Sequence, residues 1–232
     1  GWVPGMSRIP TQAIIFDMDG TMIDSMPWHA QAWVEFVRRR RMNVAVSDLM
    51  ARTTGRNGTE CIRELLGREV PQDEADALTR EKEDIYRELF GPRFAEVAGF
   101  RQFARQVADR GLKVAVGTAG DIHNVHFALS HLRMDVQPLA IVRGDEGLPG
   151  KPEPAIFLEA ARRIDVPPQH CIVFEDAPFG IEAARRAGMR AVAVCSTHSP
   201  AQLAGPHVLA AVRDYTELMN TDFLESIHVA TV

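Results

Sequence analysis

Short, almost uniformly apolar runs recur along the chain and alternate with segments of helical periodicity. Strands that are apolar on both faces are typical of a parallel sheet covered by helices on each side. Helical segments such as GFRQFARQVADRG and PEPAIFLEAARRI separate the runs, and this alternation predicts a doubly wound, Rossmann-like α/β core. The predicted strands cover residues 13–17, 113–117, 139–142, 171–175 and 191–195.

The alternation breaks once, between residues 25 and 96, where no convincing strand occurs. Three helical stretches lie there instead: one through Trp33, one through Leu65, and one from Pro71 to the stop at Gly91 and Pro92. In the third stretch, Lys82 is the polar exception in a heptad of apolar residues. We therefore predict an all-helical cap domain at residues 26–95, inserted into an α/β core made of residues 11–25 and 96–232.

Composition narrows the range of partners. The 232 residues are 46% hydrophobic and 25% charged, as in an ordinary globular protein, and 31 acidic against 26 basic residues give a net charge of −5. No overall field favours nucleic acid or an anionic membrane, and no apolar run approaches the roughly 18 residues of a membrane span. We expect neither partner, so a phosphate-bearing ligand would need local groups or a metal.

Cysteine usage and the N-terminus bear on location. Cys61, Cys171 and Cys195 lie far apart without a CxxC pair, and no signal peptide is visible, which favours a reducing, cytoplasmic compartment. We expect the opening GWVPG, residues 1–5, to be left over from expression rather than part of the fold. A monomer or small homo-oligomer is expected.

The first predicted strand ends in an acidic pair. Asp17 and Asp19 stand two residues apart before Gly20 and Thr21. Two close carboxylates repel each other, and a hard divalent cation, above all Mg²⁺, would let both stay ionised. Asp17 can then attack phosphorus while Asp19 transfers protons. The alternative is a polar turn with helix-capping acids.

Three further strand ends carry polar groups. Thr118 follows the second, Lys151 stands between Gly150 and a proline after the third, and Glu175 with Asp176 ends the fourth. Each alone has an ordinary explanation: a turn, a solvated lysine, a helix N-cap. Because ligands collect beyond the carboxyl ends of parallel strands, we expect these groups to meet. Together they supply a nucleophile, a proton carrier, a metal site and a phosphate clamp, as phosphoryl transfer requires.

The motifs resemble the haloacid-dehalogenase-like (HAD) phosphotransferase superfamily, in particular its branch of β-phosphoglucomutase and small sugar-phosphate phosphatases. The similarity covers nearly the whole chain, through DMDGT at 17–21, Thr118, GKPEP at 150–154 and FEDAPFGIEAARRAGM at 174–189. The helical insertion occupies the place of that branch's mobile cap. Asp19 argues against the dehalogenase and phosphonatase branches, which typically have tyrosine and alanine there.

The resemblance implies a role for each motif. Asp17 would form an aspartyl-phosphate, and Asp19 would protonate the leaving group and then activate water or an acceptor hydroxyl. Thr118 and Lys151 would hold the transferring phosphoryl group. The Mg²⁺ ion would be bound by Asp17, the backbone carbonyl of Asp19, Asp176 and, directly or through water, Glu175.

The resemblance also assigns substrate contacts. Ser25 and His29 stand where the mutase has a threonine and a histidine linked to cap closure and proton handling. Arg52 and Arg56 align with a cap lysine and arginine that face substrate. Solvated loop cations and an ordinary helix histidine are the alternatives. The full set of expected substrate-binding residues is Gly20, Ser25, His29, Arg52, Arg56 and Ala119.

One departure separates the candidate reactions. Gly120, Asp121 and Ile122 stand where the mutase has serine, lysine and asparagine near the second phosphate of its sugar. This charge reversal favours water as acceptor, and hence a Mg²⁺-dependent phosphohydrolase acting on a small phosphorylated metabolite such as a sugar phosphate. A hexose-phosphate mutase stays open, because Arg56 can compensate. A phosphate-sensing module like response-regulator receivers fits less well, since receivers are shorter and have no helical insertion.

Overall fold

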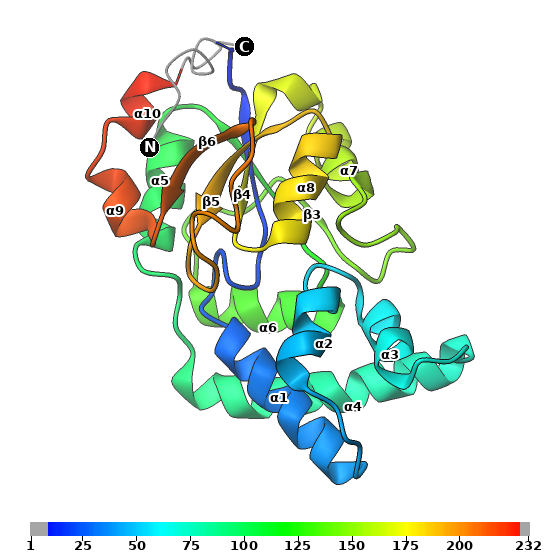
Figure 1. Ribbon diagram of the computed structural model, residues 1–232. Helices are drawn as coiled ribbons and strands as arrows, with labels where there is room; N and C mark the ends of the chain where they lie inside the picture. The colour runs from blue at the N-terminus through cyan, green and yellow to red at the C-terminus, as the bar shows by residue number, and fades with distance from the viewer. Residues whose placement is uncertain (1–8, 228–232) are drawn as a thin grey trace.

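The computed structural model of the protein describes residues 9–227, so the N-terminal segment 1–5 lies outside the described range. Its centre is a six-stranded sheet in the order β3-β2-β1-β4-β5-β6, and every neighbouring pair is parallel (Figure 1). The strands are β1 (Ala13–Phe16), β2 (Lys113–Gly117), β3 (Ala140–Val142), β4 (Cys171–Glu175), β5 (Arg190–Val194) and β6 (Val208–Val212).

Five of these strands were predicted, with ends that differ by at most one residue. The edge strand β6 was not predicted. Its sequence, VLAAV, is partly exposed and has two alanines at its centre, and alanine is a weak strand former. The prediction of a parallel, doubly wound core is confirmed.

Helices cover both faces of the sheet because alternate strand residues point to opposite sides. Ile14 and Phe16 belong to one hydrophobic cluster and Ala13 and Ile15 to the other. The first cluster is completed by α5 (Phe100–Asp109), α6 (Ile122–Leu132), α9 (Tyr215–Met219) and α10 (Phe223–Ser226). The second is completed by α7 (Ala155–Arg163) and α8 (Pro178–Arg186).

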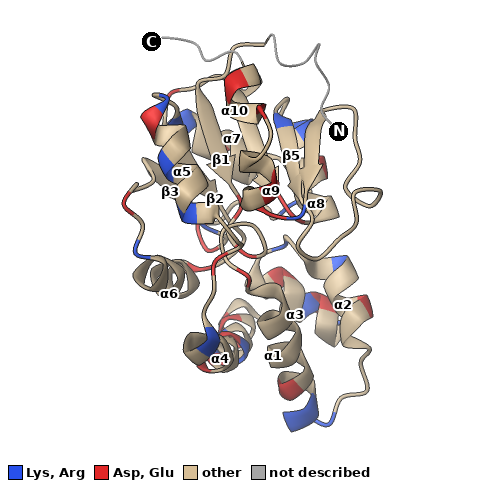
Figure 2. Cartoon of the chain, turned by 90° about the vertical axis from the view of Figure 1, so that its left-hand side faces the viewer, with Lys and Arg blue, Asp and Glu red and all other residues tan. Residues whose placement is uncertain are grey.

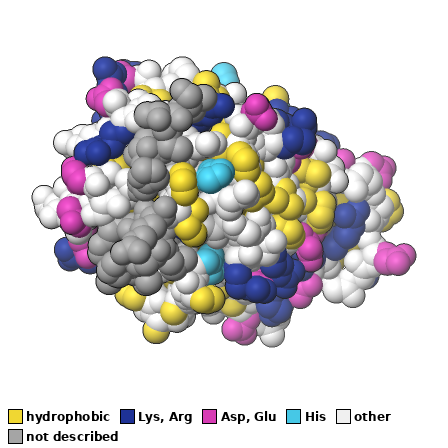
Figure 3. Space-filling view, turned by 90° about the horizontal axis from the view of Figure 1, so that it is seen from above, with side chains coloured by type: hydrophobic (Ala, Val, Ile, Leu, Met, Phe, Trp, Pro, Cys, Tyr) yellow, Lys and Arg dark blue, Asp and Glu magenta, His cyan; other side chains and the backbone are white. Residues whose placement is uncertain are grey.

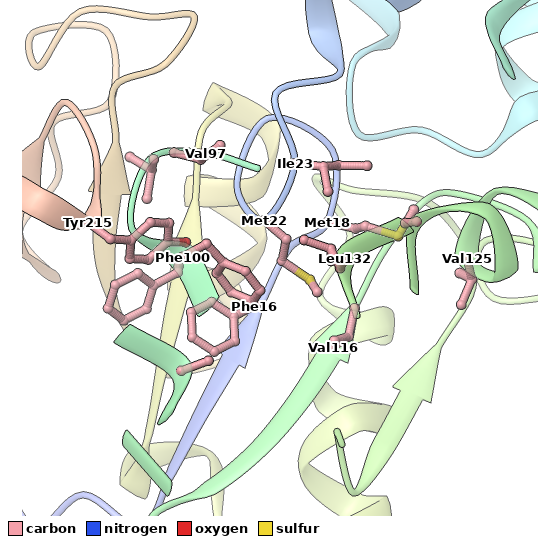
Figure 4. Packing of buried hydrophobic residues seen from close by; sticks show 14 of the residues in the cluster. Phe16, Met18, Met22, Ile23, Val97, Phe100, Val116, Val125, Leu132 and Tyr215 are labelled. Atoms are coloured by element: carbon pink, nitrogen blue, oxygen red, sulfur yellow. The ribbon is translucent and has the colours of Figure 1, made fainter. Parts of the chain in front are cut away.

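Aromatic packing in the first cluster fixes the loop that follows β1. The ring of Phe16 lies 5.0 Å from that of Phe100 and 6.2 Å from that of Tyr215, centroid to centroid (Figure 4). The Tyr215 hydroxyl donates a hydrogen bond of 2.8 Å to the carbonyl oxygen of Thr21. The core therefore holds the segment that carries the acidic pair.

Four helices between β1 and β2 form a separate layer beyond the carboxyl ends of the strands (Figure 1). They are α1 (Met26–Arg39), α2 (Val46–Thr53), α3 (Gly58–Leu66) and α4 (Gln72–Phe90). Three correspond to predicted helical stretches. The sequence prediction did not include α2, which has only eight residues and two of them buried, too short for a clear helical period.

Charged side chains of both signs are spread over the molecule. Basic and acidic side chains both occur on the helices α1 to α4 (Figure 2). On the face seen in Figure 3, outside the part covered by grey atoms, both signs are interspersed with hydrophobic side chains. Within residues 9–227, no helix has the length and apolar character needed to span a membrane.

Candidate active site

The structure brings the polar groups of the strand ends together at one edge of the sheet. Lys151 Nζ lies 2.7 Å from Asp17 Oδ1 and 2.8 Å from Glu175 Oε2, so groups that follow or end three different strands meet. Asp17, Lys151, Glu175 and Asp176 are all buried, and Lys151 is only 1% exposed. These four charged side chains are therefore enclosed by protein rather than exposed to solvent.

Lys151 is held in one orientation. Its Nζ also donates to the carbonyl oxygen of Gly117 at 3.1 Å, and its backbone N–H donates to the carbonyl oxygen of Gly55 at 3.0 Å. Burial lowers the pKa of Lys151, but the charges of Asp17 and Glu175 outweigh this and raise the pKa above its usual value. The ammonium group is thus a fixed positive charge at the floor of the site.

Three carboxylates crowd beside this lysine. One oxygen each from Asp17, Glu175 and Asp176 lies within 4.8 Å of the others. Burial and the charge of Asp17 raise the pKa of Glu175 to about 7, and burial with the charges of Asp17 and Glu175 raises that of Asp176. One lysine does not compensate three carboxylates. A hard divalent cation with oxygen ligands would, so the donor set fits Mg²⁺.

Thr21, which the sequence analysis did not include in the site, links two of these carboxylates. Its Oγ1 lies 3.1 Å from Asp17 Oδ2 and 3.2 Å from Asp176 Oδ1. A hydroxyl has one hydrogen to donate, so Thr21 satisfies only one of them at a time. The other oxygen keeps a free lone pair for a cation.

Gly20 allows the loop after β1 to approach Asp176. Its φ is +78°, and a Cβ at this position would lie 2.0 Å from Asp176 Oδ2. Only glycine fits both the backbone conformation and the space. The structure thus gives Gly20, expected among the substrate-binding residues, a close packing contact with a candidate metal ligand.

Asp19 faces the helical layer. Its Oδ1 accepts a hydrogen bond of 2.7 Å from the Ser25 hydroxyl and lies 3.1 Å from His29 Nε2. Burial raises the pKa of Asp19, but the positive charge of the His29 and Lys82 pair, with the hydrogen bonds from His29 and Ser25, outweighs it, so this pKa lies below its usual value. Asp19 is therefore ionised near neutral pH.

Lys82 was not predicted as a site residue, although its polar position on an apolar helix face signalled it. Its Nζ lies 2.7 Å from His29 Nδ1 and 2.9 Å from Glu83 Oε1. Lysine offers only donors, so His29 Nδ1 accepts and its Nε2 carries the hydrogen directed at Asp19. Glu83 in turn accepts a 2.6 Å hydrogen bond from Asn124 Nδ2 of α6, which joins α4 to the core.

Residues in the loop after β5 also contact the acidic cluster and the turn after β1, although no sequence motif indicated them. Ser196 Oγ donates to the carbonyl oxygen of Gly20 at 2.6 Å, and Thr197 Oγ1 donates to Asp176 Oδ2 at 3.3 Å. His198 Nδ1 lies 3.0 Å from the carbonyl oxygen of Asp176. This loop positions both the turn after β1 and a candidate metal ligand.

A pocket lies between this edge of the sheet and the helical layer. The volume of this pocket is about 780 Å³, which includes the part that is open to solvent. Thr118 and Ala119 line it from the core, and Thr118 Oγ1 accepts a hydrogen bond of 2.9 Å from the Gly120 amide. Arg56 lines it from the loop between α2 and α3. These positions suit a ligand whose phosphate sits at Asp17.

The two expected cap arginines differ in position. Arg52 lies in α2 with about half of its side chain exposed, and its Nε donates to Glu64 Oε1 at 2.9 Å. It does not belong to the described residues that line the pocket. Arg56 lies 3.7 Å from Glu64 Oε2 and 3.9 Å from Glu60 Oε2.

Comparison with known proteins places the chain among hydrolases. The model of the haloacid dehalogenase-like hydrolase family matches residues 11–188. The fructose-1-phosphate phosphatase YqaB of Escherichia coli is 35% identical over 185 residues, which are 78% of this chain and 95% of that protein. The validoxylamine A 7'-phosphate phosphatase of Streptomyces hygroscopicus is 31% identical over 205 residues, 88% of this chain and 94% of that protein.

Solved structures agree on the fold. The crystal structure of β-phosphoglucomutase from Clostridium difficile superimposes with a TM-score of 0.81 at 24% identity, covering 94% of this chain and 97% of that one.

Proposed function

The chain belongs to the haloacid dehalogenase-like hydrolase family, and on this premise we propose that it is a Mg²⁺-dependent phosphatase of a small phosphorylated metabolite, in particular a sugar phosphate. The observation that carries the proposal is the position of Asp17. It is buried at a strand end, 2.7 Å from the ammonium group of Lys151 and inside a cluster of carboxylates. The similarity to phosphatases named for fructose 1-phosphate and for validoxylamine A 7'-phosphate supports the substrate class.

Asp17 acts as the nucleophile in this proposal. Its carboxylate oxygen attacks phosphorus, the bond between phosphorus and the leaving oxygen breaks, and an aspartyl-phosphate forms. The ammonium group of Lys151 and the groups around Thr118 neutralise and orient the phosphoryl oxygens. Water then attacks the same phosphorus, the bond to Asp17 breaks, and inorganic phosphate is released.

Asp19 transfers the protons of both steps. Asp19 is a carboxylate in the free site and takes up a proton when the negatively charged phosphate enters beside it, because a neighbouring like charge raises its pKa. It donates this proton to the leaving oxygen in the first step and, as a carboxylate again, takes a proton from the attacking water in the second. The hydrogen bonds from Ser25 and His29 hold its carboxylate toward the pocket. The His29–Lys82 pair favours the ionised form that the second step requires.

The Mg²⁺ ion would be held by Asp17, Asp176, the backbone carbonyl of Asp19 and, directly or through water, Glu175. When bound, it supplies positive charge that offsets the repulsion between nucleophile and phosphate. Thr21 and Thr197 orient the carboxylate of Asp176.

Residues 26–95 act as a cap over this site. Met26, Trp33 and Met50 of this segment line the pocket opposite Thr118 and Ala119 of the core. Closure of the cap keeps bulk water from the aspartyl-phosphate, and the hydrogen bond between Glu83 and Asn124 joins the two sides in the closed arrangement. We propose residues 11–25 and 96–232 as the α/β core into which this cap is inserted.

A phosphatase fits better than a mutase of the β-phosphoglucomutase type. Three relatives that are more than 30% identical are named as phosphatases, whereas the mutase structure at 24% identity shows the fold alone. Phosphorus NMR of the products separates the two. A phosphatase gives inorganic phosphate, while a mutase gives isomerised sugar phosphate and is stimulated by a bisphosphate.

The test is phosphate release from a panel of sugar phosphates, polyol phosphates and nucleotides, with and without Mg²⁺. We expect Mg²⁺-dependent release from at least one sugar phosphate and loss of turnover, by about 10³-fold or more, in Asp17→Asn. Asp24→Asn is the matched control, because Asp24 lies in the same loop but is exposed. Full activity of Asp17→Asn, or stable phosphorylation of Asp17 without turnover, would refute the proposal.

A further inference from the structure

The leaving group of the substrate must lie in the part of the pocket formed by α1 to α4. With a phosphoryl group at Asp17 and its leaving oxygen at Asp19, the space that remains is lined by Trp33, Met50, Thr53, Thr54 and Arg56. The charges around this space decide what the leaving group can carry.

Arg56, the arginine in this lining, already has carboxylate partners. Its guanidinium lies 3.9 Å from Glu60 and 3.7 Å from Glu64. Other bonds hold both carboxylates in place. Glu60 Oε1 accepts the Asn57 amide at 2.9 Å in the capping box of α3, and Glu64 Oε1 accepts Arg52 Nε at 2.9 Å. Two arginines and two glutamates cancel, so this wall carries no net positive charge for a second anion.

The lysine that lines the pocket from α4 is also neutralised. Lys82 lies 2.9 Å from Glu83, which is held from its other side by Asn124 at 2.6 Å. Burial raises the pKa of Glu83, but the charge of Lys82 and the hydrogen bonds from Lys82 and Asn124 outweigh this and hold the pKa below its usual value. Glu83 thus stays ionised and offsets the charge of Lys82.

The cleft next to the pocket offers no surplus of cations. It shares Gly58, Thr79 and Ala119 with the pocket. Its charged lining consists of two arginines, Arg63 and Arg80, against Glu60, Asp76, Asp121 and Asp145. Glu60 already lies beside Arg56, and Asp145 accepts a hydrogen bond of 2.8 Å from Arg143 Nε, so the two remaining acids balance the two arginines. A second phosphate that extended from the pocket into this cleft would find no uncompensated positive side chain.

In this part of the pocket a hydroxyl group of the ligand finds hydrogen-bond acceptors, whereas a phosphate finds no uncompensated cation. Thr53 and Thr54 each donate their hydroxyl hydrogen to a carbonyl oxygen of α2 at 2.7 Å, so their oxygens remain free to accept. Met50 and Trp33 supply apolar surface beside them. This lining suits an uncharged leaving group with hydroxyls, such as a sugar or polyol.

From this charge distribution we infer that the pocket selects monophosphates and discriminates against substrates that carry a second phosphate. The inference rests on the proposed phosphatase function and adds a charge limit to its substrate class. Glu64 and Asp121 are its specificity-determining residues: Glu64 compensates Arg56, and Asp121 adds a negative charge to the neighbouring cleft. A second dianion would lose its hydration without gaining a cation.

Matched pairs of ligands test the inference: fructose 1-phosphate with fructose 1,6-bisphosphate, and glucose 1-phosphate with glucose 1,6-bisphosphate. Phosphate release gives kcat/KM for each, and calorimetry on Asp17→Asn with Mg²⁺ gives Kd without turnover. We expect a preference of about 100-fold for the monophosphate in at least one pair, since like charges in a binding site cost several kcal/mol.

A double variant, Glu64→Gln with Asp121→Asn, tests the origin of the preference. Asparagine keeps the N-cap that Asp121 provides to the Asn124 amide at 2.9 Å. We expect the ratio of monophosphate to bisphosphate affinity to fall about tenfold or more, because Arg56 loses one of its two carboxylate partners and a repelling charge is removed. The matched control is Glu35→Gln on α1, a glutamate that also pairs with two arginines, Arg38 and Arg39, away from the pocket; it should leave the ratio unchanged.

The outcomes separate the two proposals. Equal turnover of both members of each pair overturns the inference and leaves the phosphatase proposal standing. A binding preference for the monophosphate without any turnover supports the inference and rejects the phosphatase. If no member binds or reacts, both are rejected. A preference that persists unchanged in the double variant shows that it arises from size rather than charge, and overturns the inference as well.

Discussion

At the scale of single residues, the chemistry of Asp19 depends on a lysine from a distant part of the chain. Lys82 of α4 contacts His29 of α1, and His29 contacts Asp19 in the loop after β1. The ring of His29 also stacks on that of Tyr86, 3.7 Å between centroids, so it cannot turn away. Lys82 acts through His29, as a positioning residue rather than a group that touches substrate.

We predict that Lys82→Met lowers kcat about tenfold to 100-fold and moves the acid limb of the pH profile to higher pH. Loss of the positive charge raises the pKa of Asp19, so a higher pH is needed to produce the carboxylate used in the second step. Profiles of kcat against pH for both proteins measure the shift. Lys113→Met is the control, because Lys113 Nζ binds a carbonyl oxygen, that of Ile164, outside the site. An unchanged profile in Lys82→Met would contradict this role.

Thr197 is a second residue whose effect is indirect. Its hydroxyl donates to Asp176 at 3.3 Å, so Thr197→Val removes the bond at nearly constant side-chain volume. Partners of metal ligands typically contribute about tenfold to 100-fold in metal affinity, and we expect a loss at the lower end of this range. Calorimetric titration with Mg²⁺ measures it directly. Thr216→Val removes a similar bond to Asp214 at 2.5 Å, and neither residue belongs to the acidic cluster or lines the pocket, so it should not change Mg²⁺ binding.

At the scale of elements, the turn after β1 is specified by one glycine. We predict that Gly20→Ala abolishes detectable activity, because the new methyl group would displace Asp176, whose Oδ2 lies 2.0 Å from the position of such a Cβ. Gly111→Ala is a close control: its φ is +77°, against +78° for Gly20, but nothing lies within 4 Å of a Cβ there. Both variants carry a backbone strain of about 1 kcal/mol, measurable by thermal unfolding. If Gly111→Ala lost activity equally, strain and not the contact would be responsible.

The same elements show what the sequence can and cannot predict. β1, β2 and β4 are buried on both faces, so their apolar runs are continuous and were predicted to within one residue. β6 and α2 were missed because their patterns are short and half-exposed. The hydrophobic pattern of a sequence reflects which residues are buried, so an element that is only partly buried has a weak pattern.

Some residues of the candidate active site can likewise be predicted from the sequence, and others cannot. Asp17 directly follows β1, Glu175 ends β4, and Lys151 lies in the loop after β3, so the topology of a parallel sheet indicates that they meet. Glu83, Asn124 and Thr197 reach the site from α4, α6 and the loop after β5, and their contacts depend on how helices pack onto the sheet. No local spacing encodes such contacts.

At the scale of the whole molecule, the acidic cluster links stability to pH and to metal. Burial and the charge of Asp17 raise the pKa of Glu175 from 4.5 to about 7, and the pKa of Asp176 is raised as well. A carboxyl group with a raised pKa in the folded state stabilises the fold fully below its unfolded pKa. This contribution is lost as the pH rises through the folded value. The metal-free protein should therefore lose stability between about pH 5 and pH 8.

Mg²⁺ should reverse this loss, because it binds the deprotonated carboxylates. We predict that the gain in Tm on adding Mg²⁺ is small at pH 5 and largest at pH 8. At a concentration about 100 times its Kd, the ion stabilises the folded state by about 2.7 kcal/mol, or about 5–10 °C for a chain of this size. Thermal unfolding at both pH values, with and without Mg²⁺, measures the gain. Asp176→Asn should remove it, and Asp24→Asn, which changes an exposed carboxylate, should retain it. An equal gain at both pH values would show that Mg²⁺ does not compete with protons for Glu175 and Asp176, and the ion would then bind elsewhere.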